Sequence, residues 1–166
     1  MEKRGAKIIL VLLIVIVLFI SMYISLYLII GMGISGNIIG LSESQKEEKI
    51  VTKIIDGDTV IVEGGESVRL LGIDCDEKGK ECFTPAKKRI DELLLGKTVE
   101  LEMEKEDRDM YDRQLRWIFL NGNNINLQLV EEGYCVARFV GESKYKEEIQ
   151  KAEKNAIING IGCKWS

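Results

Sequence analysis

The chain has 166 residues and a formal net charge of −4, and it contains no histidine. The lack of histidine excludes Ser-His and Cys-His nucleophile pairs and metal binding through imidazole. Any chemistry must therefore come from carboxylates, Lys, Arg, Tyr, Cys or a bound cation, and a hard cation with oxygen ligands is favoured over zinc.

An uncharged run rich in Ile, Leu and Val covers residues 8–30. As a helix it would span roughly 34 Å at ~1.5 Å per residue, enough to cross a hydrocarbon core of ~30 Å. Basic residues precede the run, and no charge follows it until Glu43. By the positive-inside rule we expect a cytoplasmic tail over residues 1–7, a transmembrane helix or signal anchor over residues 8–30, and export of the remainder. The alternative is a cleaved signal peptide and a secreted domain, although the apolar region of such a peptide usually has only about 7–15 residues.

Residues 31–48 resemble a linker, because Gly and Ser come first and charged residues follow. The remaining segment, residues 49–166, is long enough for one small domain with a single core. The part of the chain expected outside the cytoplasm has a net charge of −6. Proteins that bind nucleic acid along its whole length without sequence preference are basic. Binding a polyanion here would therefore require a local basic patch or a bound cation.

Five β-rich runs and three helical segments follow one another in this domain. We expect strands over residues 49–55, 59–63, 67–73, 98–104 and 115–120, and helices from Thr84 to Gly96, over 126–132 and over 144–159. Glycines between the second and third strands indicate a hairpin, and Thr84 followed by proline indicates a helix start. This order predicts an α+β fold, a five-stranded OB-fold β-barrel with three helices, preceded by one transmembrane helix. Strand count alone also fits other small α+β folds.

Two of the expected strands each place a carboxylate at a turn. Asp58 precedes the second strand, Asp74 ends the third, and Arg69 and Glu77 lie close to them in sequence. Carboxylates bind hard cations such as Ca²⁺, and an arginine fork suits a phosphate. A metal site beside a phosphate site is the outline of a phosphodiesterase. Taken alone, Asp-Gly-Asp is also a common turn, and Glu77 is also compatible with an ordinary solvated charge.

Four motifs in this order resemble the staphylococcal nuclease-like (thermonuclease) family. They are IDGDT at 55–59, RLLGID at 69–74, DMYDR at 109–113 and NLQLVEEG at 126–133, with Glu153 and GCKW at 162–165 closing the set. The resemblance covers residues from about Lys49 to Trp165. It implies the five-stranded OB barrel with three helices, and Ca²⁺-dependent hydrolysis of phosphodiester bonds in DNA or RNA.

The resemblance also implies a metal site. Asp58 and Asp74 look like the Ca²⁺ carboxylates, and the backbone carbonyl of Cys75 would join them. Glu77 stands where the family places the carboxylate usually assigned as general base to the attacking water.

For the phosphate, the resemblance implies that Arg69 and Arg113 act on the scissile group, and that Tyr111 contacts a nucleotide phosphate. Two guanidinium groups aimed at the non-bridging oxygens would stabilise the charge that develops there. Arg113 also has acidic neighbours, Asp109 and Asp112, so a plain surface ion pair is the alternative. Tyr111 also fits a turn residue that covers the core.

Three positions depart from the family pattern. Met110 replaces a lysine, Phe139 replaces a tyrosine that lies against the substrate, and Asp76 replaces a proline. These changes would weaken or alter nucleotide contacts while leaving the metal and arginine residues in place.

The four cysteines are Cys75, Cys82, Cys135 and Cys163. In an exported domain an even number suggests disulfides, and four cysteines allow three pairings. We expect Cys75 with Cys82, closing the short loop of Glu77, and Cys135 with Cys163. Four free buried thiols are the alternative, and a Cys₄ zinc site is disfavoured because no C-x₂-C pair occurs.

The sequence therefore predicts a membrane-anchored, extracytoplasmic, Ca²⁺-dependent nuclease that acts on DNA or RNA and has no implied protein partner. A catalytically inactive nuclease-like OB module that binds nucleic acid or a protein partner is the alternative. Family members of that kind typically lose the metal carboxylates, which this chain keeps. A plain membrane-tethered structural domain is a third reading, and it would not require this charged set.

Overall fold

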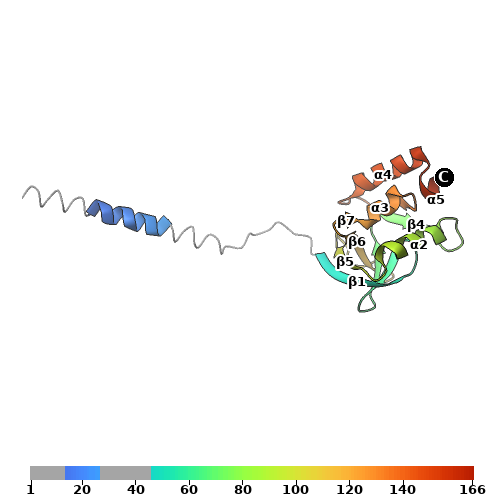
Figure 1. Ribbon diagram of the computed structural model, residues 1–166, viewed down its shortest axis with the longest axis horizontal. Coiled ribbons are helices and arrows are strands. Elements are labelled where there is room, and N and C mark those ends of the chain that lie inside the picture. Colours follow the sequence, from blue (N-terminus) through green and yellow to red (C-terminus); the bar gives the residue numbers. More distant parts are fainter. Residues whose placement is uncertain (1–13, 27–45) are drawn as a thin grey trace, which may run out of the picture. The chain divides into compact units, whose positions relative to one another are not determined.

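The computed structural model describes residues 14–26, which are helical, and residues 46–166, which form the domain drawn from cyan to red in Figure 1. The expected cytoplasmic tail, most of the expected linker and both ends of the apolar run lie outside the described residues. Within the described ranges no helix is both long enough and apolar enough to span a membrane. The transmembrane helix expected over residues 8–30 therefore finds no support here.

A closed β-barrel forms the centre of the domain. Its strands are β1 (Lys46–Ile54), β2 (Thr59–Val62), β3 (Ser67–Leu70), β5 (Thr98–Glu102) and β6 (Gln114–Leu120). Antiparallel pairs join β3 to β2, β2 to β1, β1 to β5 and β5 to β6, and a parallel pair of β3 with β6 closes the ring. The predicted α+β fold with a five-stranded, OB-like barrel is confirmed. Closure also removes the exposed sheet edges on which other chains could pair.

The long first strand serves both halves of the barrel. Its first half pairs with β5, and its second half pairs with β2, with a register shift between Val51 and Lys53 inside the β1–β2 pair. This irregularity bends the strand, so the two halves can face different partners. Apolar side chains from every barrel strand fill the interior, including the fully buried Val51, Leu70 and Trp117.

The described residues contain five helices, one at 14–26 and four in the domain, where three were expected. The domain helices are α2 (Phe83–Leu94), α3 (Ile125–Glu131), α4 (Lys146–Asn159) and α5 (Gly162–Trp165). α2 begins one residue before the expected Thr84 and has Cys82 at its N-cap position. The extra element, α5, is a single turn after the left-handed C-cap Gly160. A helix this short carries too few residues to produce a 3.6-residue period.

The third expected strand is interrupted at Gly72, where φ is +71°. A Cβ at this position would lie 2.5 Å from the Trp117 ring and 2.7 Å from the Phe139 ring. The chain therefore turns out of the barrel and continues as β4 (Ile73–Cys75), which pairs with β8 (Cys135–Ala137) in a separate two-stranded sheet. A further short strand, β7 (Asn123–Asn124), extends β6 by a hairpin.

The disulfide pairing differs from the expected one. Cys75 is bonded to Cys135 and Cys82 to Cys163, so no cysteine is free. The pairing follows from the tertiary structure, because Cys75 lies opposite Cys135 in the β4–β8 ladder, and the Cα atoms of Cys82 and Cys163 are 5.5 Å apart. A loop-closing Cys75–Cys82 bond would have required neither contact.

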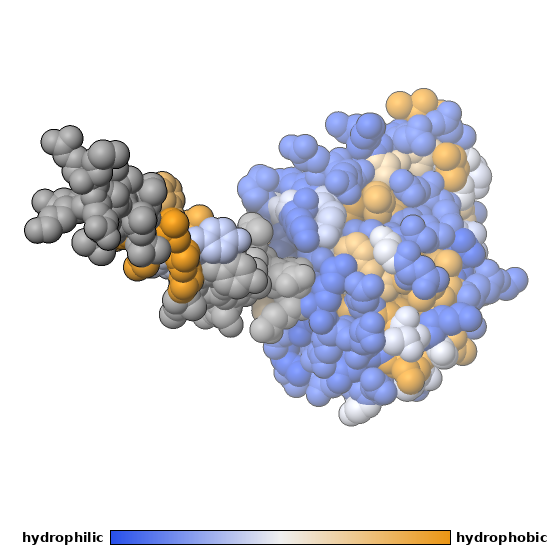
Figure 2. Space-filling model, turned by 60° about the vertical axis from the view of Figure 1, so that its left-hand side comes forward, coloured by the Kyte–Doolittle hydropathy of each residue, from blue (hydrophilic) through white to orange (hydrophobic). Residues whose placement is uncertain are grey.

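The domain face shown in Figure 2 is mostly hydrophilic, with apolar side chains in small separate groups. Exposed large apolar residues of the domain include Val140, Met110 and Ile158, which are 100%, 88% and 81% exposed. Single exposed apolar residues are normal on folded domains, but Met110 and Val140 belong to segments that adjoin the predicted site.

Candidate active site

Arg69 brings together the two carboxylates that were predicted to hold a metal. Its neighbours Val68 and Leu70 are buried in the barrel, so the Arg69 side chain points outwards. Its Nη1 atom lies 3.2 Å from Asp58 Oδ2, and its Nη2 atom lies 3.0 Å from Asp74 Oδ1. The same guanidinium group donates to the backbone carbonyls of Leu70 and Ile73, each at 3.0 Å. Three predicted site residues from three segments of the chain therefore form one cluster.

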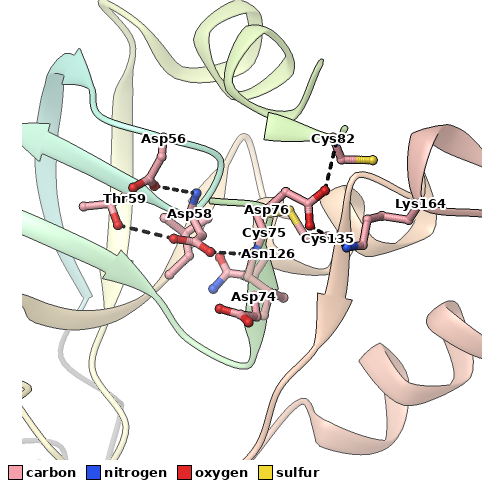
Figure 3. Close-up of a disulfide and its surroundings, with 12 residues drawn as sticks. Asp56, Asp58, Thr59, Asp74, Cys75, Asp76, Cys82, Asn126, Cys135 and Lys164 are labelled. Carbon is pink, nitrogen blue, oxygen red and sulfur yellow. Dashed lines mark hydrogen bonds and ion pairs between the residues drawn. A yellow bond between two sulfur atoms is a disulfide. The ribbon is translucent and has the colours of Figure 1, made fainter. Parts of the chain in front are cut away.

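Asp58 is the most buried member of this cluster, with 6% of its surface exposed. Its Oδ2 atom accepts the backbone N–H of Cys75 at 2.7 Å, and its Oδ1 atom accepts the Thr59 hydroxyl at 3.3 Å (Figure 3). Burial raises the pKa of Asp58 to about 6, even though the charge of Arg69 and the Cys75 N–H both lower it. Its negative charge is thus only partly compensated by the protein, which is the condition that a bound cation would relieve.

The turn before Asp58 is fixed by tight packing. The Asp56 side chain accepts the backbone N–H of Asp58 at 3.1 Å. A Cβ on Gly57 would lie 2.7 Å from the Cys75 Cβ and 2.9 Å from the Ala86 Cβ, so only glycine fits between β4 and α2. Residues 56–58 therefore form a tightly packed turn. This turn places the Asp58 side chain beside Arg69.

Asp74 is more accessible, with 48% of its side chain exposed. Its Oδ1 atom binds Arg69, and its Oδ2 atom has no protein partner among the described residues. No group of three or more His, Cys, Asp and Glu side chains gathers as a metal site in the described ranges. The two carboxylates fit a hard cation that takes most of its ligands from water. Because all four cysteines are in disulfides, the domain offers no thiolate to a softer metal.

Glu77 lies in the loop between β4 and α2, and it is exposed. Its backbone carbonyl accepts the N–H of Lys80 at 3.0 Å. Its carboxylate makes no hydrogen bond or ion pair with any residue that the structure describes. The structure therefore places Glu77 next to the cluster in the chain, but does not bring its carboxylate into contact with Asp58, Arg69 or Asp74.

Arg113 and Tyr111 lie in the turn that leads into β6. The Arg113 side chain binds Asp109 Oδ2 through Nε and Nη2, each at 2.7 Å, and its guanidinium carbon is 5.4 Å from the centre of the Tyr111 ring. Burial alone would raise the pKa of Asp109, but hydrogen bonds from Arg113 and Tyr111 hold that pKa below its ordinary value. Arg113 is therefore ion-paired here and does not touch the Arg69 cluster.

The turn nevertheless lies beside the strand that carries Arg69. In the parallel ladder Gln114 is opposite Val68, and Leu115 is opposite Arg69. Arg113 is thus two residues before the partner of Arg69. Tyr111 is 72% exposed and the Arg113 side chain is 30% exposed, so a molecule on the surface can reach the Tyr111 ring and part of the Arg113 side chain.

A cavity of about 390 Å³ lies next to the cluster. Its apolar part is formed by Leu71, Leu115, Phe139 and Val140, and its rim is formed by Glu104, Lys105, Glu106, Arg138, Glu142 and Ser143. Leu115 joins the cavity to Arg69 across the β3–β6 pair. Sequence reasoning had singled out only Phe139 among these residues.

Comparison with known proteins identifies the family of the chain. The model of a family described as staphylococcal nuclease homologue matches residues 67–166, which is more than half of the chain. The chain belongs to this family. The thermonuclease of Staphylococcus hyicus is 32% identical over 131 residues, covering 70% of this chain and 75% of the thermonuclease. Endonuclease YncB of Bacillus subtilis strain 168 is 32% identical over 143 residues, covering 76% of this chain and 67% of that endonuclease.

Membership of the staphylococcal nuclease family confirms the predicted resemblance and supports a nuclease function. The family match begins at Ser67 and so includes Arg69, Asp74 and Arg113. Asp58 precedes the matched residues, and its place in the cluster rests on the distances to Arg69 and Cys75.

Two further polar residues of the region have roles that the sequence did not reveal. Asn126, in α3, is fully buried, accepts from the Ile118 N–H at 3.0 Å and donates to the Leu71 carbonyl at 2.9 Å. These hydrogen bonds hold the backbone in place where it leaves β3.

Asp76 binds Lys164 at 2.7 Å, and this hydrogen bond holds the pKa of Asp76 below its ordinary value. Asn126 occurs within a family motif, and Asp76 replaces a residue of another motif. The residues around each of them do not predict which groups they bind.

Proposed function

We propose that this protein is a Ca²⁺-dependent nuclease that hydrolyses phosphodiester bonds in DNA or RNA outside the cytoplasm. The observation that carries the proposal is the cluster in which Arg69 lies 3.2 Å from Asp58 and 3.0 Å from Asp74. A cation-binding pair of carboxylates beside a guanidinium group suits a substrate that develops negative charge on phosphate oxygens. Relatives named thermonuclease and endonuclease support the same reaction class.

Asp58, Asp74 and the backbone carbonyl of Cys75 are the groups that would hold the cation. The Cα atoms of Cys75 and Cys135 are 4.3 Å apart. This is close to the ~4.5 Å of a non-hydrogen-bonded antiparallel pair, in which the backbone N–H and C=O of each residue point away from the other strand. The N–H of Cys75 accordingly donates to Asp58, and the carbonyl of a strand residue points to the same side as its N–H. A bound Ca²⁺ would orient a water molecule and neutralise charge on the phosphate.

The two arginines would bind the phosphate. Arg69 already lies at the carboxylates. Arg113 must leave Asp109 to reach the same phosphate, and breaking this pair costs free energy because its side chains are only 30% and 17% exposed. A positioned donor to a developing oxyanion contributes about 3–4 kcal/mol in the transition state, which opposes that cost.

Glu77 would take the proton from the attacking water. Its carboxylate is exposed and makes no contact with protein among the described residues, so water can reach it. A general base needs hydrogen-bond reach to its proton in the substrate complex, and such contacts are often formed only there.

The cavity beside Arg69 would take a nucleobase. Phe139 supplies an aromatic ring for stacking, a contact that tolerates every base, and Leu115 adds apolar surface beside it. Met110 and Tyr111, both largely exposed at the neighbouring turn, extend this surface. Because Met110 has no charge, it adds no phosphate contact of its own.

The alternative is an inactive module of the same fold that binds nucleic acid or a protein partner. One observation favours it: Arg113 is paired with Asp109 rather than directed at the carboxylates. The presence of Asp58 and Asp74 together at Arg69 favours the enzyme. Without a bound cation, two carboxylates at this position would repel phosphate and weaken binding of nucleic acid.

Two disulfides that use all four cysteines support action in an oxidising compartment, outside the cytoplasm. Separating cells into membrane, soluble and external fractions would distinguish an anchored form from a secreted one. Recovery of the chain in the reduced state from the cytoplasm would contradict the proposed location.

The activity test uses the purified full-length chain with single-stranded DNA and, separately, RNA. We expect cleavage in Ca²⁺ and loss of cleavage after addition of a chelator, with recovery when Ca²⁺ is restored. Binding of either polymer without cleavage at any Ca²⁺ concentration would favour the inactive module instead.

A further inference from the structure

The loop that carries Glu77 is covalently fixed at both ends. The loop consists of residues 76–81, between Cys75 at the end of β4 and Cys82 at the N-cap of α2. Cys75, just before the loop, is bonded to Cys135 in β8, and Cys82, just after it, is bonded to Cys163 in α5. The two bonds attach the loop to two different elements of the C-terminal part of the domain.

Asp76 joins the two ends of the loop to each other. Its Oδ2 atom accepts the backbone N–H of Cys82 at 2.9 Å, and its Oδ1 atom binds Lys164 Nζ at 2.7 Å. Figure 3 shows Asp76 between the start of α2 and the Lys164 side chain. Both side chains of the pair are largely buried, with 19% of Asp76 and 21% of Lys164 exposed. The pair is thus better shielded from solvent than the exposed ion pairs of the barrel surface.

Helix α5, which carries Lys164, packs closely against the chain at residues 132–133. The backbone N–H of Lys164 donates to the Gly133 carbonyl at 3.1 Å. A Cβ on Gly133 would lie 1.8 Å from the Ile161 carbonyl oxygen, and one on Gly162 would lie 2.2 Å from the Glu132 carbonyl oxygen. Because the two backbones pack at this distance, α5 is a fixed support.

We propose that Asp76 and Lys164 are positioning residues for Glu77, holding the base of its loop so that the carboxylate is directed at the reacting water. The inference rests on the proposed function of Glu77. The Glu77 carboxylate makes no contact of its own with the described residues, so its position depends on the loop backbone. Asp76 is the residue next to it, and among the described residues its side chain alone accepts from the far end of the loop and also binds Lys164 of α5.

The test is a double-mutant cycle on turnover by the full-length chain, with Lys164→Met, Glu77→Gln and the double variant. We expect Lys164→Met to lower kcat by up to ~10²-fold with little change in KM, because displacing a catalytic group by about 1 Å has effects of that size. In the Glu77→Gln background the same change should have almost no further effect. Lys164→Arg should restore most of the rate. Lys46→Met, which removes the exposed Lys46–Glu100 pair between β1 and β5, is the matched control and should leave kcat unchanged.

Amide hydrogen exchange over residues 76–82 provides a readout that does not depend on activity. We expect faster exchange in Lys164→Met and in Asp76→Asn, and wild-type exchange in Lys164→Arg. Equal loss of kcat from Lys164→Met in the wild-type and Glu77→Gln backgrounds would overturn the positioning role, as would unchanged exchange in the loop. A folded wild-type chain that cleaves nothing would instead refute the proposed function, and the positioning role with it.

Discussion

The backbone N–H of Cys75 donates to Asp58 Oδ2 across 2.7 Å, and the side chain of the same residue is bonded to Cys135. One residue of β4 thus connects the most buried carboxylate of the site to the C-terminal part of the domain. The site and the disulfide framework are therefore mechanically coupled at Cys75. The second disulfide, Cys82–Cys163, has no such direct contact with Asp58.

Removing the two disulfides separately should distinguish these roles. The variants Cys75→Ser with Cys135→Ser, and Cys82→Ser with Cys163→Ser, should each lose about 2–5 kcal/mol of unfolding free energy, as is usual for native disulfides. Only the first pair should also weaken Ca²⁺ binding, because it loosens the strand that holds Asp58. Denaturant unfolding and calorimetric Ca²⁺ titration measure the two effects. Equal Ca²⁺ affinity in both double variants would argue against the coupling.

Gly57→Ala should destabilise the domain through overlap of atoms. The added Cβ would lie 2.7 Å from the Cys75 Cβ and 2.9 Å from the Ala86 Cβ, and overpacking of this kind usually costs about 1–3 kcal/mol. Gly64→Ala is a useful comparison, because nothing lies within 4 Å there and only its positive φ opposes the change. Urea denaturation should give a clear loss for Gly57→Ala together with weaker Ca²⁺ binding, and Ca²⁺ binding should be normal in Gly64→Ala. Normal Ca²⁺ affinity in Gly57→Ala would show that the turn does not control Asp58.

The exchange of partners proposed for Arg113 can be tested by conservative substitution. Arg69→Lys and Arg113→Lys should each lower turnover by ~10²–10³-fold, since a lysine cannot reproduce a bidentate fork. Arg89→Lys serves as the control, because Arg89 pairs with Glu132, 2.6 Å away, and has no part in the proposed chemistry. Wild-type turnover in Arg113→Lys would mean that the pair with Asp109 is its whole role.

The ion pair between α2 and α3 predicts a pH dependence of stability. Arg89 binds both oxygens of Glu132 at 2.6 Å. Burial alone would raise the pKa of Glu132, but the hydrogen bonds from Arg89 and Gln128 hold that pKa below its ordinary value of 4.5. A carboxyl group with a lowered folded-state pKa stabilises the fold above the unfolded pKa and loses that contribution as the pH falls through the folded pKa.

Wild type should therefore be more stable than Glu132→Gln at pH 7, by roughly 1 kcal/mol for a partly exposed pair. The difference should shrink as the pH falls below 4.5. Thermal unfolding between pH 3 and pH 7 measures it, and Lys88→Met, which removes the exposed Lys88–Glu92 pair, should show no comparable change. A difference independent of pH would assign the effect to packing instead of charge.

Local sequence patterns located most of the barrel strands, and the family resemblance was needed to select the barrel and the residues of the cluster. The alternation of residues in the strands and the glycines of the first hairpin identify the barrel strands, because these signals lie within a few residues of each other. Asp58, Arg69 and Asp74 could be grouped because they flank neighbouring strands and belong to recognisable motifs. Their contact through a single guanidinium group could not be predicted, since it depends on the break of the chain at Gly72.

Contacts between distant segments were beyond reach from one sequence. The pairing of Cys75 with Cys135 and of Cys82 with Cys163 spans 60 and 81 residues, and the number of cysteines restricts the possibilities without selecting one. The Asp76–Lys164 pair is equally remote in sequence. The position of the Arg113 side chain depends on whether it binds Asp109 or a substrate phosphate. The order of residue types in the sequence does not predict which of the two it binds.

The most direct test of the central claim is the Ca²⁺ dependence of the cleavage rate of single-stranded DNA in wild type, Asp58→Asn and Asp74→Asn. If these carboxylates hold the cation, each substitution should raise the Ca²⁺ concentration that gives half-maximal rate and should lower the maximal rate. Asp107→Asn, at a carboxylate that pairs with Arg116 and not with a member of the cluster, should leave both quantities unchanged. Identical Ca²⁺ dependence in wild type and in both site variants, with all proteins folded, would contradict the account.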